Sequence, residues 1–335
     1  MKEFMAKNSS SSDFSLLSKL KEKVIPLGLG AILVSILSCL LFINPPWFAK
    51  FLDNIDDFDY DLAVRYFHKP LGKDPSVVII DIDDKSINEE GRWPWPREKF
   101  ADLVKALYKM GATVVGFDLT FPNPEENLVD QVIKEIKLHP IAKTPDAKTP
   151  DILPQLETLK PAFNYDQFFA ESLKGGDSIL GMVFLNDAEA QGDLPPPFLA
   201  MPAGSLDKLS VPSMPGYLSN IPILQSATKV GGFINATPDT DGVLRVTPMV
   251  LGYKGNLYSS LSLQSVSSYL LTQKIDLITA LYGDFAVLEG VLLDKLAIPT
   301  DPLGRMLIPF RGPAYTFPYV SASDVLNNKT PTSSI

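Results

Sequence analysis

The chain has 335 residues and a net charge of −9, with 45% hydrophobic residues and about a fifth charged. This length and composition can support one large folded domain or two smaller ones. The acidic charge repels phosphate backbones and therefore argues against nucleic acid as a partner. The single cysteine, Cys39, excludes an intrachain disulfide, and neither histidine, His68 or His139, has the spacing of a metal ligand. No cofactor is predicted.

Residues 24–43 form an apolar run without a charged side chain, long enough to cross a bilayer as a helix. Pro26 would then lie in the first turn of that helix, where its missing N–H costs nothing. A retained membrane anchor is the favoured interpretation. The alternatives are a cleaved signal peptide, for which the run is too long and lacks a cleavage site, and a buried core helix, which would carry a charged face.

The charges on either side of the run predict its direction. Basic residues precede it at Lys19, Lys21 and Lys23, and acidic residues follow at Asp53, Asp56, Asp57, Asp59 and Asp61. The positive-inside rule therefore predicts a cytoplasmic tail at residues 1–23 and an extracytoplasmic domain at residues 48–335, anchored in the cell (inner) membrane.

The segment after the anchor begins with a helix-period pattern at residues 48–67. A continuous apolar run at 76–82 predicts a buried strand, and residues 97–110 predict a helix that ends at Gly111. Residues 112–119 predict a second buried strand. Strand, helix and strand in this order indicate a βαβ unit with the two strands parallel.

Later segments alternate between helix and strand patterns. Helices are predicted at 129–136, 164–173 and 260–271, and strands at 178–185, 286–288 and 306–309. Two antiparallel strands are expected in residues 231–253, around a turn at 239–242. The predicted fold class is α/β with a mixed sheet, preceded by one transmembrane helix.

Three carboxylates are the most distinctive polar feature. Asp81 lies near the end of the first predicted strand and Asp83 directly after it, and Asp118 follows the apolar part of the second. The carboxyl ends of parallel strands meet at one edge of a sheet, where α/β proteins bind ligands. These acids therefore form either a ligand or cation site, or structural partners of backbone N–H groups and Arg97. No nucleophile or histidine accompanies them, so no catalytic or metal-binding residue is predicted.

The segment from Gly91 to Arg97 alternates tryptophan with proline. Its indoles, Trp93 and Trp95, could form the wall of a binding site, or could instead cover the edge of the sheet. The ligand-binding residues predicted from the sequence are Asp83, Trp93, Trp95, Arg97 and Asp118.

Several blocks resemble the second type of CHASE domain, an extracellular sensory domain attached to cyclases and kinases. The most specific block is DDKSI at 83–87 followed by GRWPWPR at 91–97. Weaker blocks follow in the family's order: GFD at 116–118, GF at 232–233 with PDTDGVLR at 238–245, LYSSLS at 257–262 and GRMLIPFRGP at 304–313. The resemblance spans about residues 60–326.

This resemblance implies a sensor that binds an unknown small-molecule or extracytoplasmic ligand, contacts the bilayer through residues 24–43 and forms a homodimer. It also implies that the signal passes to a cytoplasmic adenylate or guanylate cyclase or a kinase that is not in this chain. Two features depart from the family pattern: long loops at 122–161 and 187–222, and a sequence that ends at Ile335 before any output module. The alternative function is a membrane-tethered, metal-dependent enzyme that uses the Asp81, Asp83 and Asp118 edge.

Overall fold

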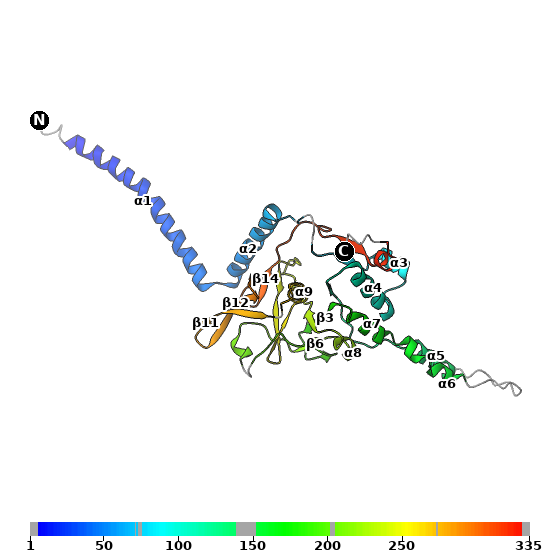
Figure 1. The fold of residues 1–335 in the computed structure, drawn as a ribbon. Helices are drawn as coiled ribbons and strands as arrows, with labels where there is room; N and C mark the ends of the chain where they lie inside the picture. Colours follow the sequence, from blue (N-terminus) through cyan, green and yellow to red (C-terminus); the bar gives the residue numbers. More distant parts are fainter. Residues whose placement is uncertain are drawn as a thin grey trace. The chain divides into compact units, whose positions relative to one another are not determined.

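The computed structural model describes residues 6–70, 72, 76–138, 152–201, 205–272 and 274–329 (Figure 1). His139 lies outside these residues. The chain divides into two compact units, one formed by residues 1–70 with 310–312 and the other by residues 71–309 with 313–335.

The first unit contains two long helices, α1 (Ala6–Ile43) and α2 (Pro46–Phe67). Asn44 separates them with a left-handed φ of 43°, and the extended Pro45 precedes the first residue of α2. In α1, the stretch Ile25–Ile43 is long and apolar enough to cross a membrane, and none of its most apolar window is buried. This confirms the apolar helix predicted at residues 24–43.

The start of α1 corrects one detail of that prediction. The helix begins at Ala6, so Pro26 lies inside it rather than in its first turn. Residues 6–23 contain neither glycine nor proline, and the lysines and leucines among them favour helix, so nothing in this stretch interrupts the helix before residue 24.

The second unit is an α/β domain, which confirms the predicted fold class. Its main sheet places β3 (Asp177–Leu185) between β2 (Val114–Gly116) and β7 (Val230–Phe233), with both neighbours parallel to it. At the far end of β3, β6 (Gly216–Leu218) pairs with it antiparallel, and β4 (Ala190–Gln191) extends this edge. The sheet is therefore mixed, as the sequence predicts.

The parallel strand pairs differ from those predicted. The strand at residues 76–82 appears as β1 (Ile79–Asp81), and it pairs in parallel with β15 (Tyr319–Ser321) near the other end of the sequence. The strand at residues 112–119 appears as β2, whose parallel partner is β3. The connection between β2 and β3 includes α7 (Tyr165–Leu173), so a βαβ unit exists one strand later than predicted.

The core beside this sheet is aromatic. Helix α4 (Arg97–Met110) packs against α7, and their buried faces contribute Phe100 and Phe169, whose rings lie 5.7 Å apart. Phe121, in the segment after β2, completes the cluster at 5.2 Å from Phe100 and 5.1 Å from Phe169. Helix α4 ends as predicted at Gly111, whose φ of 108° favours glycine.

Antiparallel strands form the rest of the domain. The hairpins are β9 (Val250–Tyr253) with β10 (Asn256–Ser259), and β11 (Ile275–Tyr282) with β12 (Phe285–Leu293) and β13 (Leu296–Pro299). The predicted turn at residues 239–242 is present, with Gly242 N donating to Asp239 O at 2.9 Å. Its flanking strands do not form the predicted hairpin, because β7 pairs with β3 and β8 (Val246–Pro248) pairs with β14 (Arg305–Leu307).

The remaining elements are short. They are α3 (Asp84–Glu90), α5 (Leu128–Leu138), α6 (Leu153–Glu157), η1 (Lys160–Phe163), β5 (Leu199–Ala200), η2 (Leu206–Lys208), α8 (Pro222–Gln225), α9 (Leu261–Tyr269) and α10 (Ala322–Leu326).

Candidate functional site

Asp83 caps the helix that follows β1. Its backbone is extended at φ −78° and ψ 176°, and its carboxylate accepts a hydrogen bond from Ser86 N at 2.8 Å, which satisfies one of the free N–H groups at the start of α3. The carboxylate also accepts a hydrogen bond from Ser321 Oγ at 2.9 Å. Burial alone would raise the pKa of Asp83, but the hydrogen bonds from Ser86 and Ser321 outweigh it and hold the pKa below its usual value.

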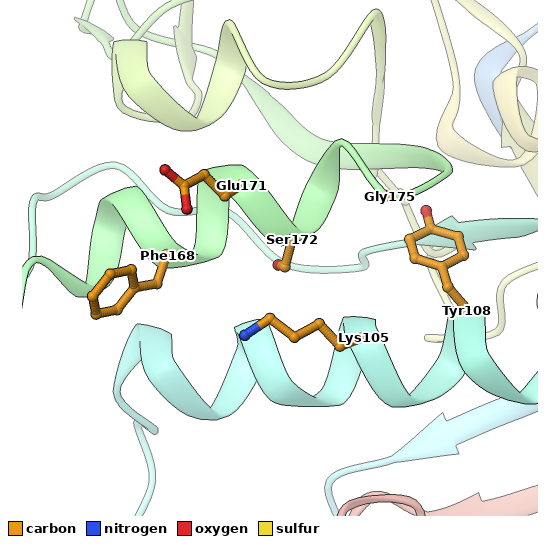
Figure 2. A pocket seen from close by; sticks show the side chains of 6 residues that line it. All are labelled: Lys105, Tyr108, Phe168, Glu171, Ser172 and Gly175. Atoms are coloured by element: carbon orange, nitrogen blue, oxygen red, sulfur yellow. The ribbon is translucent and has the colours of Figure 1, made fainter.

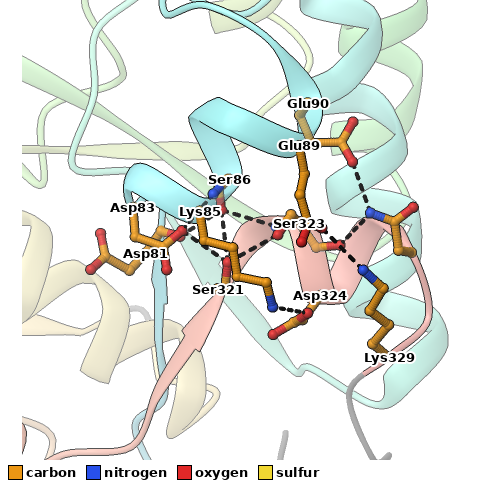
Figure 3. Close-up of polar contacts among 11 residues, drawn as sticks. Asp81, Asp83, Lys85, Ser86, Glu89, Glu90, Ser321, Ser323, Asp324 and Lys329 are labelled. Atoms are coloured by element: carbon orange, nitrogen blue, oxygen red, sulfur yellow. Dashed lines mark hydrogen bonds and ion pairs between the residues drawn. The ribbon is translucent and has the colours of Figure 1, made fainter.

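Around Asp83, three hydroxyls form what we call the serine cluster: Ser86, Ser321 and Ser323 (Figure 3). Ser86 Oγ lies 2.9 Å from Ser321 Oγ and accepts a hydrogen bond from Ser323 N at 3.1 Å. Ser86 and Ser323 are fully buried. The cluster therefore joins α3 to β15 and α10, which come from opposite ends of the domain sequence.

Ion pairs and a side-chain amide surround the serine cluster on its exposed side. Lys85 pairs with Asp324, and Lys329 Nζ lies 3.1 Å from Glu89 Oε2 (Figure 3). Asn327 donates to Glu90 Oε1 at 2.9 Å. Each contact links α3 with the segment around α10, so the two segments are held together by polar groups both inside and outside the core.

The two tryptophans occupy different environments. Trp95 is only 2% exposed, and its Nε1 donates to Gly91 O at 2.9 Å. Trp93 is 37% exposed, with its ring 6.0 Å from that of Phe100 and 6.3 Å from that of Trp95. Trp95 thus belongs to the core, whereas Trp93 lies over it with one side accessible to a ligand.

Arg97 is a largely buried cation at the start of α4. Its Nε lies 3.4 Å from Asp166 Oδ1, its Nη2 donates to Asn123 O at 3.2 Å, and its guanidinium carbon is 4.4 Å from the centre of the Phe121 ring. Burial lowers the pKa of Arg97, and Asp166 and Glu125 oppose that shift. The carboxylates that pair with Arg97 are therefore not Asp83 and Asp118, which the sequence suggested.

Asp118 lies apart from the other predicted site residues. It follows β2 and is exposed, and no hydrogen bond or ion pair of its carboxylate is formed with the part of the chain that the structure describes. Asp83 follows β1, which belongs to a different sheet. The structure therefore does not join these two carboxylates, and a role for either in ligand binding stays a prediction.

Two surface pockets lie near the ends of α4. One, of about 370 Å³, is formed by Lys105 and Tyr108 of α4 together with Phe168, Glu171, Ser172 and Gly175 (Figure 2). Tyr108 has its hydroxyl 2.6 Å from Ser178 Oγ, and burial raises its pKa. These lining groups have local partners, since Lys105 pairs with Asp102 and Glu171 accepts from Gln167.

The other pocket, of about 480 Å³, is next to Arg97. It is lined by Pro96, Glu98, Glu125, Glu126, Leu128, Gln131 and Tyr165. Burial raises the pKa of Glu125, and hydrogen bonding from Arg97 N at 2.7 Å lowers it in part. Burial also raises the pKa of Tyr165, with Glu98 and Glu125 adding to the shift.

Sequence reasoning missed the partners of the predicted residues. Ser321, Ser323 and Asp166 are more than 60 positions away from Asp83 and Arg97, and no local pattern connects them. A weak signal existed in the two serines at the start of α10, Ser321 just before the helix and Ser323 in its first turn, because serine is typical of helix N-termini. For Asp166 the weak signal was its place in the first turn of α7, two residues after Asn164, whose side chain caps that helix.

One helix long and apolar enough to cross a bilayer precedes the α/β domain in the sequence, a combination that suggests a membrane protein. Residues 32–335 match the CHASE2 domain family, and the chain belongs to this family of extracellular sensory domains. No curated protein matches the chain. No solved structure matches it either.

Proposed function

We propose that the chain is the extracytoplasmic sensory part of a transmembrane signalling receptor. The observation that carries the proposal is the CHASE2 match over residues 32–335, together with the apolar helix at Ile25–Ile43. A sensory domain that follows a membrane helix can transmit a change in its own packing to that helix. The chain itself then acts by binding a ligand and changing shape rather than by catalysing a reaction.

In this proposal residues 1–23 are cytoplasmic, residues 24–43 span the cell (inner) membrane and residues 48–335 lie outside. The basic side chains before the span and the acidic ones after it support this direction. A reporter active only in the cytoplasm should work when fused at residue 10. A reporter active only outside should work when fused after residue 335, with no later span included. The opposite pattern would overturn the orientation, and a mature chain lacking residues 1–43 would show a cleaved signal peptide.

The proposed receptor is a homodimer that passes its signal to a cytoplasmic adenylate or guanylate cyclase or a kinase. The support is the resemblance to the family, in which the sensory domain is followed by further membrane spans and an output module. Reading the gene past residue 335 tests this directly. Further apolar spans followed by a cyclase or kinase sequence would support it. An immediate stop codon, with metal-dependent hydrolysis by the purified chain, would favour the enzyme alternative.

The geometry offers the enzyme alternative little support. The carboxylate of Asp83 is engaged by Ser86 and Ser321, and Asp118 is exposed away from that network. Within the described ranges, no group of three or more His, Cys, Asp or Glu side chains is arranged to hold a metal ion. The sensory function is therefore the better interpretation of these residues.

For ligand binding we propose that Trp93 is the strongest of the predicted contacts, because its ring is rigidly supported by Phe100 and still accessible. The test is a thermal-shift screen of the whole chain in detergent with amino acids, nucleotides, sugars and divalent cations. A compound that stabilises the wild type should stabilise Trp93→Ala less, whereas Lys105→Ala should respond like the wild type. Equal stabilisation of Trp93→Ala would remove Trp93 from the binding site.

A further inference from the structure

Helix α2 carries an exposed stripe of large apolar side chains. They recur at intervals of four, three, four and four residues, and each is between 41% and 68% exposed: Phe51, Ile55, Phe58, Leu62 and Tyr66. Residues at these intervals lie on one face of a helix. We call this face the α2 stripe. Water-exposed aromatic and aliphatic groups in a continuous row indicate a surface that contacts another protein or a membrane.

The first four residues of the stripe have the spacing of a coiled-coil seam, whereas Tyr66 lies one position after the next core position, which Arg65 occupies. Phe51 and Phe58 fall on one heptad core position, and Ile55 and Leu62 fall on the other. The acidic side chains of α2 lie at other positions of the heptad, with Asp53 two residues from Phe51 and so on the opposite side of the helix. The helix thus presents a narrow apolar seam rather than a broad apolar face.

We propose that the α2 stripe is covered by the α2 stripe of a second copy of this chain, in a parallel helix pair. The inference rests on the proposed function, because two copies anchored through α1 in the same bilayer emerge in the same direction. Their α2 helices therefore start at the same level, and each core residue faces its own counterpart.

The charges beside the seam are compatible with a parallel pair. In that arrangement each residue on one flank faces the residue five positions later on the other helix, so Asn54 faces Asp59 and Asp61 faces Tyr66. No carboxylate is placed opposite another across the seam, and the charged core position, Arg65, lies in the last turn of α2, at the end of the seam. The area is also sufficient, since side chains of this size and exposure offer roughly 500 Å² per helix, and two facing stripes about 1,000 Å².

The acidic character of α2 disfavours the membrane surface as the alternative occupant. Helices that lie on membranes usually carry lysine and arginine on the polar face, where they attract anionic lipids. The polar positions of α2 instead include Asp53, Asp56, Asp57 and Asp59. The polar face of α2 therefore lacks the basic character of a helix that lies on a membrane surface.

Cysteine cross-linking of the full chain in native membranes tests the proposal. Cys39 is the single cysteine, so Cys39→Ser provides a cysteine-free background. Ile55→Cys and Leu62→Cys are introduced one at a time, with Asp53→Cys as the matched control on the opposite face. All three positions are exposed, so the substitutions leave the fold intact. Under mild oxidation Ile55→Cys and Leu62→Cys should each yield covalent dimer several-fold more than Asp53→Cys.

Other outcomes would overturn the parallel seam. If neither seam position cross-links alone but a mixture of the two does, the helices are antiparallel. If nothing cross-links and a fluorophore on Phe58→Cys is quenched by spin-labelled lipid, the stripe lies on the membrane. If nothing cross-links and the fluorophore is shielded from both lipid and water, the stripe packs on the chain's own domain.

The cross-linking result is separable from the proposed function. Cross-linking requires neither a ligand nor an output module, and it reports only which faces of α2 meet. A reversed orientation would appear in the reporter fusions while the cross-linking pattern remained the same. If the seam positions do not cross-link while the reporter fusions show the proposed orientation, the sensory proposal remains and only this interface is rejected.

Discussion

Ser86 Oγ and Ser321 Oγ lie 2.9 Å apart although 235 positions separate them in the chain. The carboxylate of Asp83 accepts hydrogen bonds from the backbone N–H of Ser86 and from Ser321 Oγ, so one acid organises two distant segments of the domain. The hydroxyl of Ser86 also accepts from the buried Ser323 N–H. Each loss of a partner here leaves a polar group without water or protein to replace it, which makes the serine cluster a stability determinant.

Replacing Ser86 with alanine should destabilise the domain by about 1–3 kcal/mol, because the N–H of Ser323 becomes buried without an acceptor. The matched control is Ser226→Ala, which removes an exposed hydroxyl that bonds only Ile223 O and should change stability by less than about 0.5 kcal/mol. Urea unfolding followed by circular dichroism measures both. Equal effects of the two substitutions would show that the serine cluster does not stabilise the fold.

Asp83→Ala removes the cap of α3 and should cost about 0.5–2 kcal/mol at neutral pH. Asp83→Asn keeps a capping oxygen and should cost less. Because the folded pKa of Asp83 is lowered, its ionised form contributes stability above its ordinary pKa of 3.8, and that contribution is lost as the pH falls below this value through the lower folded pKa.

The pH dependence of unfolding separates the role of Asp83 as the cap of α3 from the contribution of its ionised carboxylate. The wild type should lose more stability than Asp83→Asn when the pH is lowered from neutral to below 3.8. Parallel curves for the two proteins would show that ionisation of Asp83 contributes nothing, even if the cap does.

Arg97→Met should destabilise the domain by about 3 kcal/mol, because Asp166 remains largely buried without its cation. The double variant Arg97→Met with Asp166→Leu should recover part of that loss, since the largely buried charge of Asp166 is then removed as well. Lys105→Met is the control, because its pair with Asp102 is exposed on both sides and is worth at most about 1 kcal/mol. Additive effects of the two single substitutions would contradict an interaction between Arg97 and Asp166.

Trp95→Ala should cost about 3–5 kcal/mol, since it opens a cavity in the core and leaves Gly91 O without its donor. Trp93→Ala should cost less, about 1–2 kcal/mol, because part of this ring is exposed. Thermal unfolding followed by circular dichroism, rather than by tryptophan fluorescence, compares the two. A larger loss for Trp93→Ala would reverse the assignment of core and surface tryptophan.

The local elements could be predicted from the sequence because their information is local. The apolar positions of α4 follow the helix period and stop at a glycine that adopts positive φ, and β3 is a continuous apolar run. The same holds for α9, which has its serine cap at Ser260. Periodicity and caps act over a few residues, so a single sequence suffices for them.

The strand partners could not be predicted in the same way. The apolar run predicts a buried strand, whereas β1 is half-buried, and the run does not specify whether β2 or β15 lies next to it. For the same reason, the sequence could not show that Asp83 and Asp118 follow strands of different sheets. It also could not show that Asp166 pairs with Arg97. Pairing over long sequence distances depends on the packing of the whole domain, which local patterns do not encode.

The parallel pairing of β1 with β15 determines how the domain responds to force. Ile79, Ile80 and Asp81 face Tyr319, Val320 and Ser321, and both strands run the same way. Tension applied at the start of β1 and the end of β15 therefore pulls the strands along each other. The hydrogen bonds between them, and the serine contacts at their carboxyl ends, share the load and must yield together rather than open one after another. Tension along this direction therefore loads the β1–β15 pair in shear.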